Sequence, residues 1–449
     1  MPALPTVLAA IDTGDTAWLL ISTALVMLMT PGLALFYGGM VQGKNVLSTF
    51  MHSMFALGLV TVQWAVIGYS LAFAPTHGGL VGGLDFALLR GVGVEPHGTV
   101  PHILFVMYQG MFAVITPALI SGAFAERMKF SAYVLFTLLW TTLVYDPLAH
   151  WVWGPGGWLA ARGALDFAGG TVVHLSSGVS ALVAAVVIGK RLGYPNVRHQ
   201  PHNLTMTVLG AGVLWFGWFG FNAGSALTSG GLAALALANT HLAAAAGALA
   251  WGLVERVRSG KVTVLGVASG LVAGLVAITP AAGFVGPMAG IAIGAAAGLA
   301  CYGGVLVKTR FGYDDALDAF GVHGVGGALG AVLTGVFAAK IWNPAGADGL
   351  LAGNAALVGV QLLGIAAAAA YAGLLSLGIL KVLDATVGLR VAKDEEREGL
   401  DAVLHGEASY AFGMTGSAVA ARHHEPESYS APIAAGATLP SGLRSSSGA

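Results

Sequence analysis

Long runs of apolar residues are the feature that most constrains this chain. Eleven stretches are long enough to cross the roughly 30 Å hydrocarbon core of a bilayer as helices. They cover residues 16–40, 46–73, 101–125, 130–153, 166–189, 203–225, 228–252, 262–281, 284–307, 318–340 and 353–380. Only 9% of the 449 residues are charged, whereas soluble domains carry about 25%. The sequence therefore predicts an all-α polytopic membrane protein with eleven transmembrane helices.

The distribution of basic residues predicts how these helices are oriented. Lys and Arg are retained in cytoplasmic loops during insertion. If the N-terminus is outside, all but three of the 20 Lys and Arg lie in inner loops or in the tail; the exceptions are Arg90, Arg162 and Lys340. We therefore expect an N-out, C-in multi-pass protein of the inner (cytoplasmic) membrane. The first fifteen residues have no basic n-region, so we interpret them as a short external N-terminus rather than a signal peptide.

Composition also excludes several functional classes. A net charge of −1 argues against an electrostatic nucleic-acid binder, and the single Cys301 excludes an intrachain disulfide framework and a thiolate metal cluster. An intramembrane enzyme would need an activated nucleophile or a metal at the midplane, and the sequence pattern indicates neither. We expect no enzymatic activity and no cofactor.

The eleven spans divide into two groups of five and a final helix. Repeat one covers about 16–189, repeat two about 203–340 and the last helix about 353–380. Five spans per group give the two repeats opposite orientations, and inverted repeats place binding sites at the membrane midplane. The transmembrane domain is expected over 1–384, a charged and ordered cytoplasmic C-terminal region over 385–410, and a disordered tail over 411–449, where Ser, Ala, Gly and Pro dominate.

Ionisable residues within spans are costly in lipid and are therefore candidate functional residues. The histidines in this position are His52, His174, His241 and His323. An acid precedes two of them, Asp166 before His174 and Asp318 before His323, and both strings continue with Phe and Gly. These two histidines approach the midplane from opposite faces. The alternatives are that each is a buried polar group bonded to a neighbouring helix, or that they bind a metal, for which a third ligand is missing.

An aromatic cluster is predicted near the outer ends of spans three, four and six. Tyr108 and Phe112 lie in span three, Trp153 ends span four, and Phe221 and Ser225 lie in span six. Ring faces and a hydroxyl oxygen are suited to a small cation. Tryptophans near span ends are also common as interfacial belt residues, which is the alternative interpretation.

Three strings in this order resemble the signatures of the ammonium transporter family, bacterial type. They are 166–174 (DFAGGTVVH), 217–225 (GWFGFNAGS) and 320–325 (FGVHGV). The tail strings 388–391 (GLRV), 396–401 (EREGLD) and 405–410 (HGEASY) resemble that family's ordered cytoplasmic C-terminal region. The resemblance covers all eleven spans. It implies a homotrimer with one pore in each subunit and a trimeric P-II signalling protein as partner at the cytoplasmic face.

The resemblance also implies roles for individual residues. The external ammonium site corresponds to Trp153, Phe112 and Ser225, with Tyr108 one helical turn away. The stacked gate corresponds to Phe112 and Phe221, the pore proton relay to His174 and His323, and Asp166 to the acid near the pore entrance. The sequence departs from the family at Pro155, which interrupts the glycine run after Trp153.

The chemistry expected of such a pore is a proton-dependent filter. Ammonium can lose a proton in a dry passage, whereas potassium, of similar size, cannot become neutral. Ammonium would be recruited at the aromatic site, deprotonated, and conducted as ammonia past the two histidines. Two alternatives remain open at this stage: a Rhesus-type channel for the neutral gas, and an ammonium sensor with little flux.

Overall fold

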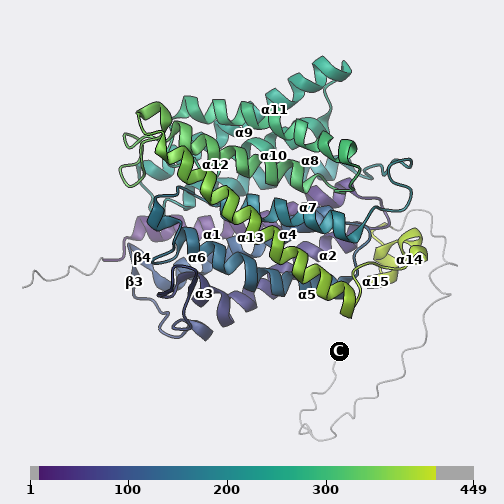
Figure 1. The fold of residues 1–449 in the computed structure, drawn as a ribbon, viewed down its shortest axis with the longest axis horizontal. Helices are drawn as coiled ribbons and strands as arrows, with labels where there is room; N and C mark the ends of the chain where they lie inside the picture. Colours follow the sequence, from purple (N-terminus) through teal and green to yellow (C-terminus); the bar gives the residue numbers. More distant parts are fainter. Residues whose placement is uncertain (1–9, 411–449) are drawn as a thin grey trace, which may run out of the picture. The chain divides into compact units, whose positions relative to one another are not determined.

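Apolar helices make up most of the computed structural model, which describes residues 10–410 (Figure 1). In this part of the chain, ten helices are long and apolar enough to cross a membrane, and α10 is a shorter apolar helix. Together they match the eleven predicted spans, so the predicted fold class is confirmed. The expectations for the extreme N-terminus and for the tail at 411–449 lie outside the described residues.

Six of the spans are single helices. They are α1 (Thr13–Met40), α4 (His102–Phe124), α9 (Gly231–Ser259), α10 (Val264–Ile278), α11 (Pro287–Phe311) and α13 (Ala356–Thr386). The other five contain one π-helical turn. They are α2 (Val46–Gln63) with η1 (Trp64–Gly68) and α3 (Tyr69–Phe73); α5 (Phe130–Trp140) with η3 (Thr141–Tyr145) and α6 (Asp146–Trp153); η5 (Gly170–Leu175) with α7 (Ser176–Ile188); α8 (Leu204–Trp218) with η6 (Phe219–Ala223); and η7 (Phe320–Gly324) with α12 (Val325–Phe337).

Short elements connect the spans. Two antiparallel pairs of two-residue strands, β1 (Thr76–His77) with β2 (Val81–Gly82) and β3 (Pro96–His97) with β4 (Val100–Pro101), lie between α3 and α4. Three 3₁₀ turns are η2 (Ala87–Leu89), η4 (Ala160–Arg162) and η8 (Leu350–Ala352), and the C-terminal region forms α14 (Lys393–Glu398) and α15 (Leu400–His405).

Local signals explain where several helices begin and end. The side chains of Asp12, Asn203 and Thr263 accept backbone N–H bonds at the starts of α1, α8 and α10, which satisfies donors that a helix start leaves free. Gly260 and Gly312 end α9 and α11 in the left-handed conformation, which glycine adopts without a Cβ penalty. The sequence thus limits the helices to lengths that fit a bilayer.

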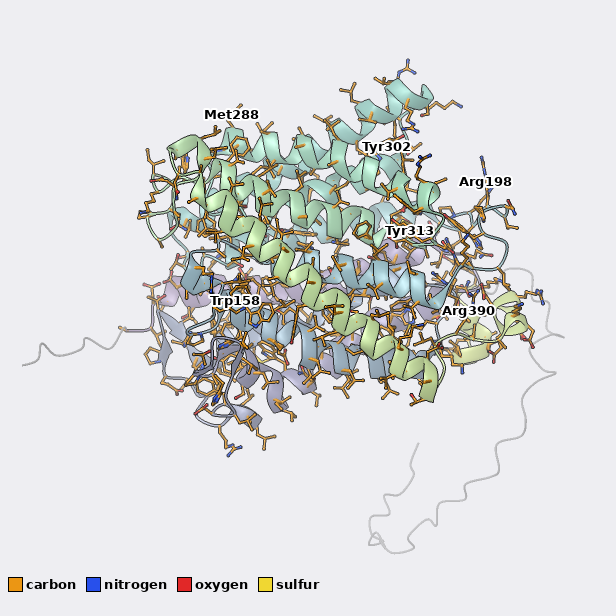
Figure 2. The ribbon with its side chains drawn as sticks, in the orientation of Figure 1. Trp158, Arg198, Met288, Tyr302, Tyr313 and Arg390 are labelled. Carbon is orange, nitrogen blue, oxygen red and sulfur yellow. The ribbon has the colours of Figure 1, made fainter. Side chains whose placement is uncertain are left out.

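Basic residues gather at one end of the helices, which we call the basic end. Arg198 and Arg390 lie there, whereas Trp158 and Met288 lie at the opposite end (Figure 2). At the basic end, the buried guanidinium of Arg191 forms ion pairs with Glu126 (2.7 Å) and Asp314 (2.8 Å). This network links the loops after α4, α7 and α11.

The C-terminal region packs on the same end. Met128 and Arg390 form an antiparallel bridge, and the Lys129 N–H donates to the Leu389 carbonyl. An Asp401 carboxylate oxygen accepts the Ser48 N–H at the start of α2 (2.8 Å). The Lys44 ammonium donates to two carbonyl oxygens of α14. The region therefore contacts both the loop after α1 and the loop after α4.

The two π-helical turns that carry histidines cross in direct contact. A Cβ atom added at Gly178, four residues after His174, would overlap the backbone of Gly324 in η7. A Cβ atom added at Gly327, four residues after His323, would lie 2.6 Å from the Gly170 carbonyl oxygen in η5. In each repeat, the glycine four residues after the histidine contacts the π-helical turn of the other repeat. This symmetry is expected for related halves.

The structure corrects one pairing between the repeats. The sequence comparison matched Asp318 to Asp166, but the counterpart of Asp166 is Asp315. Like Asp166, Asp315 lies eight residues before its histidine and accepts backbone N–H bonds at the start of the π-helical turn, from Ala319 (3.1 Å) and Phe320 (2.8 Å). Asp318 instead forms an ion pair with Lys308 (2.5 Å). The sequence paired Asp318 with Asp166 by the Phe and Gly that follow each acid, whereas helix capping depends on backbone geometry.

Candidate functional site

A cavity of about 340 Å³ lies at the end opposite the basic end. Its lining residues come from three spans and from the loops beside η5 and η6: Phe73, Phe105, Gln109, Phe112, Val152, Trp153, Phe167, Ser225 and Leu227. This lining, drawn from the described part of the chain, contains no charged side chain. It presents ring faces and two neutral polar groups, Gln109 and Ser225. We call it the outer cavity.

Trp153 is held in the wall of the outer cavity despite the Pro155 that follows it. Its indole N–H donates to the Asp166 carbonyl oxygen (2.9 Å), and its ring meets the Phe112 ring edge-on with centroids 6.2 Å apart. Gly169 has φ +110°, and a Cβ atom there would lie 3.3 Å from the Trp153 ring. The tryptophan position therefore depends on the turn that precedes η5.

The Asp166 side chain organises that turn. Its two carboxylate oxygens accept four backbone N–H bonds, from residues 169–172, at 2.7–3.1 Å. The residue is buried and does not line the outer cavity. The carboxylate therefore caps η5 and fixes the residue whose carbonyl oxygen binds Trp153.

Ser225 and Tyr108 take different places around the outer cavity. Ser225 lines it, and its hydroxyl donates to the Phe221 carbonyl oxygen (2.9 Å). Tyr108 is fully buried, and its hydroxyl contacts the carbonyl oxygens of Gly220 (2.9 Å) and Phe221 (3.0 Å). Tyr108, expected beside the external site, therefore lies behind the wall and supports the η6 turn.

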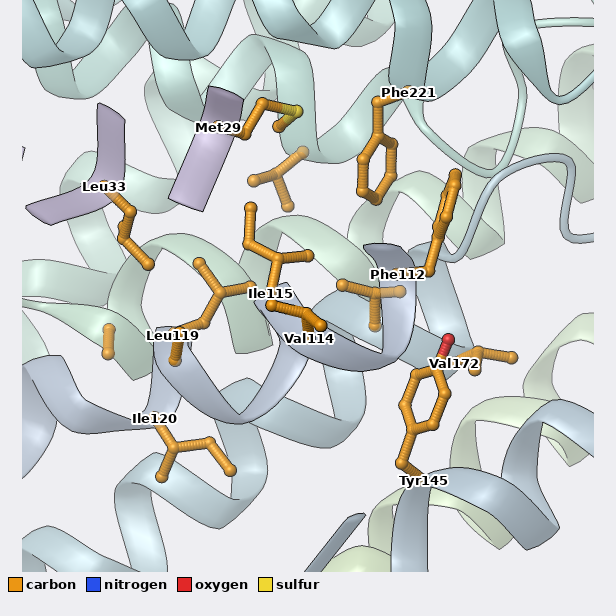
Figure 3. Packing of buried hydrophobic residues seen from close by; sticks show 14 of the residues in the cluster. Met29, Leu33, Phe112, Val114, Ile115, Leu119, Ile120, Tyr145, Val172 and Phe221 are labelled. Carbon is orange, nitrogen blue, oxygen red and sulfur yellow. The ribbon is translucent and has the colours of Figure 1, made fainter. Parts of the chain in front are cut away.

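Two stacked phenyl rings close the inner side of the outer cavity. The centroids of the Phe112 and Phe221 rings are 4.2 Å apart, and the ring planes differ by 32°. Figure 3 shows the two side chains next to each other. Both side chains are almost completely buried. Met29, Leu33, Ile115 and Leu119 continue the apolar surface beyond them (Figure 3). A passage at this point requires one or both rings to move.

The two predicted histidines meet directly beyond the phenyl rings. The Nδ1 atoms of His174 and His323 are 3.2 Å apart, so one ring donates and the other accepts. The ring planes differ by 16°, and the His174 ring also stacks on Trp218. Phe221, His174 and His323 line a cavity of only about 10 Å³, which holds about one water-sized molecule. The His174 Nε2 atom has no hydrogen-bond partner.

Two further cavities connect the histidines with the basic end. The first, of about 40 Å³, shares Phe36, Val272 and His323 with the histidine cavity. The second, of about 430 Å³, shares Met40, Leu265, Leu317 and Asp318 with the first. The cavities follow one another through the helices, so the described residues form a narrow, mostly apolar path with a wider space at each end.

Other intramembrane histidines do not lie on this path. His150 bonds to the Ala72 carbonyl and the Thr76 hydroxyl, as the buried-polar-group interpretation requires. His52 is buried against Tyr133 and Phe124. His241 is exposed on α9 and stacks on Trp215. Across residues 10–410, no three His, Cys, Asp or Glu side chains are placed to hold a metal ion.

Sequence reasoning missed several residues of the path. Phe73 and Phe105 supply rings to the outer cavity. Met29, Leu33 and Leu214 line the histidine cavity. Gln109, a polar residue that the sequence places with Tyr108 and Phe112 in span three, supplies the second polar group of the outer cavity. The apolar residues carry no distinguishing signal, because they look like any lipid-facing or core residue until the helices are packed.

The chain is a polytopic helical bundle, and its two repeats place paired histidines on a narrow internal path. This architecture is typical of membrane transport proteins. The ammonium transporter family model matches residues 17–410. An ammonium transporter of Bacillus subtilis is 54% identical over 405 residues, covering 89% of this chain and 99% of the relative. The chain belongs to the ammonium transporter family, a family of transport proteins rather than enzymes.

Solved structures agree with this assignment. Saccharomyces cerevisiae Mep2 superposes with a TM-score of 0.83 and 40% identity, covering 90% of this chain and 93% of Mep2. A structure described as a sensor Amt protein superposes with a TM-score of 0.82 and 29% identity, covering 87% of this chain and 98% of that protein. The fold is therefore shared by relatives described in different functional terms.

Proposed function

We propose that this protein moves ammonium across the membrane by recruiting the ion, removing its proton and conducting ammonia past a histidine pair. The observation that carries the proposal is the order of groups along the path. A neutral aromatic cavity is followed by the stacked Phe112 and Phe221 rings and then by His174 and His323. The family assignment supports ammonium as the substrate.

Recruitment takes place in the outer cavity. The faces of Trp153 and Phe112 attract a monovalent cation electrostatically, and the Ser225 oxygen accepts a hydrogen bond from it. Gln109 offers a further amide oxygen. Tyr108 acts as a positioning residue, because it holds the backbone turn that carries Phe221 and Ser225. Potassium can also bind there, so the cavity concentrates cations without separating them.

Selection takes place at the phenyl gate and beyond. A bare ion in a low-dielectric passage is far less stable than a neutral molecule, and the histidine cavity has room for about one small molecule. Ammonium can leave its proton and cross as ammonia, whereas potassium has no neutral form. The apolar path thus converts a difference in acidity into a difference in permeation.

The histidine pair bridges the otherwise apolar path. Its shared hydrogen bond leaves Nε2 atoms that can accept from or donate to ammonia. We propose that the pair also relays the proton, so that each event transfers a net ammonium ion. Current recordings from liposomes containing the purified protein test this point. A current under an ammonium gradient is expected, and ammonia uptake without any current would contradict the electrogenic form.

Methylammonium uptake tests the function itself. The wild-type protein should take up methylammonium but not potassium, because potassium has no neutral form that can cross the apolar path. His174→Ala removes one half of the relay and should reduce uptake about a hundredfold. His52→Ala is the control, because His52 is buried away from the path. Uptake by His174→Ala equal to that of the wild type would refute the assigned pathway.

We further propose that the basic end faces the cytoplasm of the cell and that the protein is a homotrimer in the inner membrane. The basic loops support the orientation. The exposed His241 supports assembly, since an imidazole facing lipid within a span is costly, and another copy of the chain would cover it. Mass measurement of the purified protein in detergent should give three subunits.

A P-II signalling protein is the proposed partner at the basic end. The C-terminal region lies next to the 430 Å³ cavity that would receive the partner. Arg191 lines both that cavity and a neighbouring one, which Glu396 and Arg397 of α14 also line. Pull-down of a P-II protein by the full chain and by a chain lacking 385–410 tests this. Lower recovery without the region is expected, and equal recovery from a truncated protein that still transports would contradict this docking surface.

The likeness to a sensor Amt protein makes sensing the second candidate function. A sensor binds ammonium with little flux, whereas a Rhesus-type gas channel passes ammonia without recruiting the ion. The aromatic outer cavity favours recruitment of the ion over the gas channel. The uptake and current measurements separate all three, because only the transporter gives both substantial uptake and a current.

A further inference from the structure

A carboxylate lies at the basic end of the path. Asp318 lines both the 40 Å³ cavity next to His323 and the 430 Å³ cavity that opens at the basic end. Any molecule that passes from one cavity to the other must pass this carboxylate. Lys308, on the last turns of α11, lines the same wide cavity.

The Lys308 ammonium group occupies a set of oxygen acceptors at this point. Its Nζ atom is 2.5 Å from the Asp318 carboxylate oxygen Oδ1 and donates to the Asp315 carbonyl oxygen at 3.1 Å. The two side chains are 19% and 31% exposed. The Asp318 Oδ1 atom itself is buried. Replacing a buried ion pair by apolar residues is often neutral or stabilising, so fold stability alone is a weak reason for this arrangement.

The backbone of Asp318 supports a functional interpretation. Its φ is +61°, in the left-handed region that residues other than glycine rarely adopt. Such conformations cost free energy and gather at functional sites, where the surroundings impose them. Here the surroundings are the Asp315 cap on η7 and the Val322 N–H, which donates to the Asp318 carbonyl.

The chemistry of the occupant identifies the ligand. The end of a lysine side chain is a primary alkylammonium ion, with the same N–H donors and the same charge as methylammonium. Acceptors that hold the lysine group are therefore suited to ammonium itself. A group tethered by a short chain competes at an effective concentration in the millimolar range, so it opposes binding of free ammonium up to about that concentration.

We propose that Asp318 and the Asp315 carbonyl form an inner ammonium site that Lys308 occupies as a tethered competitor, which lowers the affinity of the inner mouth for ammonium. This inference rests on the proposed transport function. Ammonium inside the cell meets a site that Lys308 already occupies. The protein consequently accepts substrate at lower concentration from the outer side than from the inner side.

The experiment compares both directions of transport in proteoliposomes of defined orientation. The half-saturating methylammonium concentration is measured for influx and for efflux. Lys308→Gln should lower the value for efflux about tenfold and leave the value for influx unchanged. Asp318→Asn introduced together with Lys308→Gln should abolish that decrease. Lys340→Gln, at the opposite end of the molecule, is the matched control and should change neither value.

A second variant separates the competitor from any effect on folding. Lys308→Cys, in a Cys301→Ala background, is reconstituted and then treated with a reagent that attaches an aminoethyl group through a disulfide. The reagent restores a tethered ammonium in protein that has already folded, so the efflux value should return towards that of the wild type. A neutral ethyl reagent should not restore it.

The outcomes distinguish this inference from the transport proposal. Equal changes in influx and efflux, no change with Lys308→Gln, or equal effects of the aminoethyl and ethyl reagents would overturn the tethered competitor. Loss of methylammonium flux in the wild type, in both directions, would instead overturn the proposed function.

Discussion

A single buried carboxylate, Asp166, connects the start of η5 with the outer cavity. Four backbone N–H groups donate to its two oxygens, and its carbonyl oxygen holds Trp153. Hydrogen bonds to a charged acceptor are worth more than neutral ones. The residue therefore affects an aromatic ring that its own side chain does not contact.

Replacement of Asp166 separates this role from simple helix capping. Asp166→Asn keeps one acceptor oxygen and leaves two buried N–H groups without a partner, at a cost of about 1–3 kcal/mol each. We expect a lower unfolding temperature and weaker methylammonium uptake, with a still larger loss for Asp166→Ala. Thermal unfolding in detergent and uptake by the same preparations provide the measurement. Wild-type behaviour of Asp166→Asn in both would show that the charge has no role.

At the scale of elements, the crossing of η5 and η7 determines the spacing of the histidines. Gly178 and Gly327 allow each helix to approach the π-helical turn of the other repeat. Small residues permit such close approach between membrane helices. The contact brings His174 and His323 within 3.2 Å although 149 residues separate them.

The glycines at this crossing should tolerate no side chain. Gly178→Ala and Gly327→Ala place a methyl group against the backbone of the opposite π-helical turn, and overpacking of this kind costs about 1–3 kcal/mol. We expect the histidines to separate and uptake to fall together with the unfolding temperature. Gly359→Ala is the control, because no atom lies within 4 Å of its added Cβ. Equal behaviour of the three variants would show that the crossing does not control the pair.

At the scale of the whole molecule, the ion pairs of Arg191 join loops from both repeats. Burial alone would raise the pKa of Asp314, but the hydrogen bonds and charge of Arg191 outweigh it and lower the pKa to about 2. Burial would also raise the pKa of Glu126, but the charge of Arg191 and hydrogen bonds outweigh burial and lower that pKa. The loops after α4, α7 and α11 therefore depend on two ionised carboxylates.

These lowered pKa values predict a loss of stability in acid. A carboxyl group whose pKa is lower in the folded state stabilises the fold above its unfolded pKa, 3.8 for Asp314, and that contribution is lost as the pH falls towards about 2. Asp314→Asn removes one partner of a buried pair and should cost about 3–5 kcal/mol at neutral pH. Unfolding temperatures measured between neutral pH and pH 3 should fall less steeply for the variant than for the wild type. Parallel curves would contradict this role of Asp314.

Much of the architecture followed from local information in the sequence. Each span could be recognised because hydrocarbon excludes charge and unpaired backbone groups over a fixed thickness. The histidines were visible because ionisable residues are rare in such segments. Interrupted helices were not predicted: the five π-helical turns, including η5 and η7, insert extra residues that leave the hydropathy pattern unchanged.

The sequence by itself determined that this chain spans a membrane with eleven apolar helices and carries two histidines in related positions, since hydropathy and spacing are properties of neighbouring residues. Only the tertiary structure decided that Asp315 rather than Asp318 caps η7, that Tyr108 lies behind the outer cavity, and that Lys308 reaches Asp318. These outcomes depend on distances between helices and on backbone direction. Both are set by contacts between residues far apart in the sequence, so local sequence patterns do not reveal them.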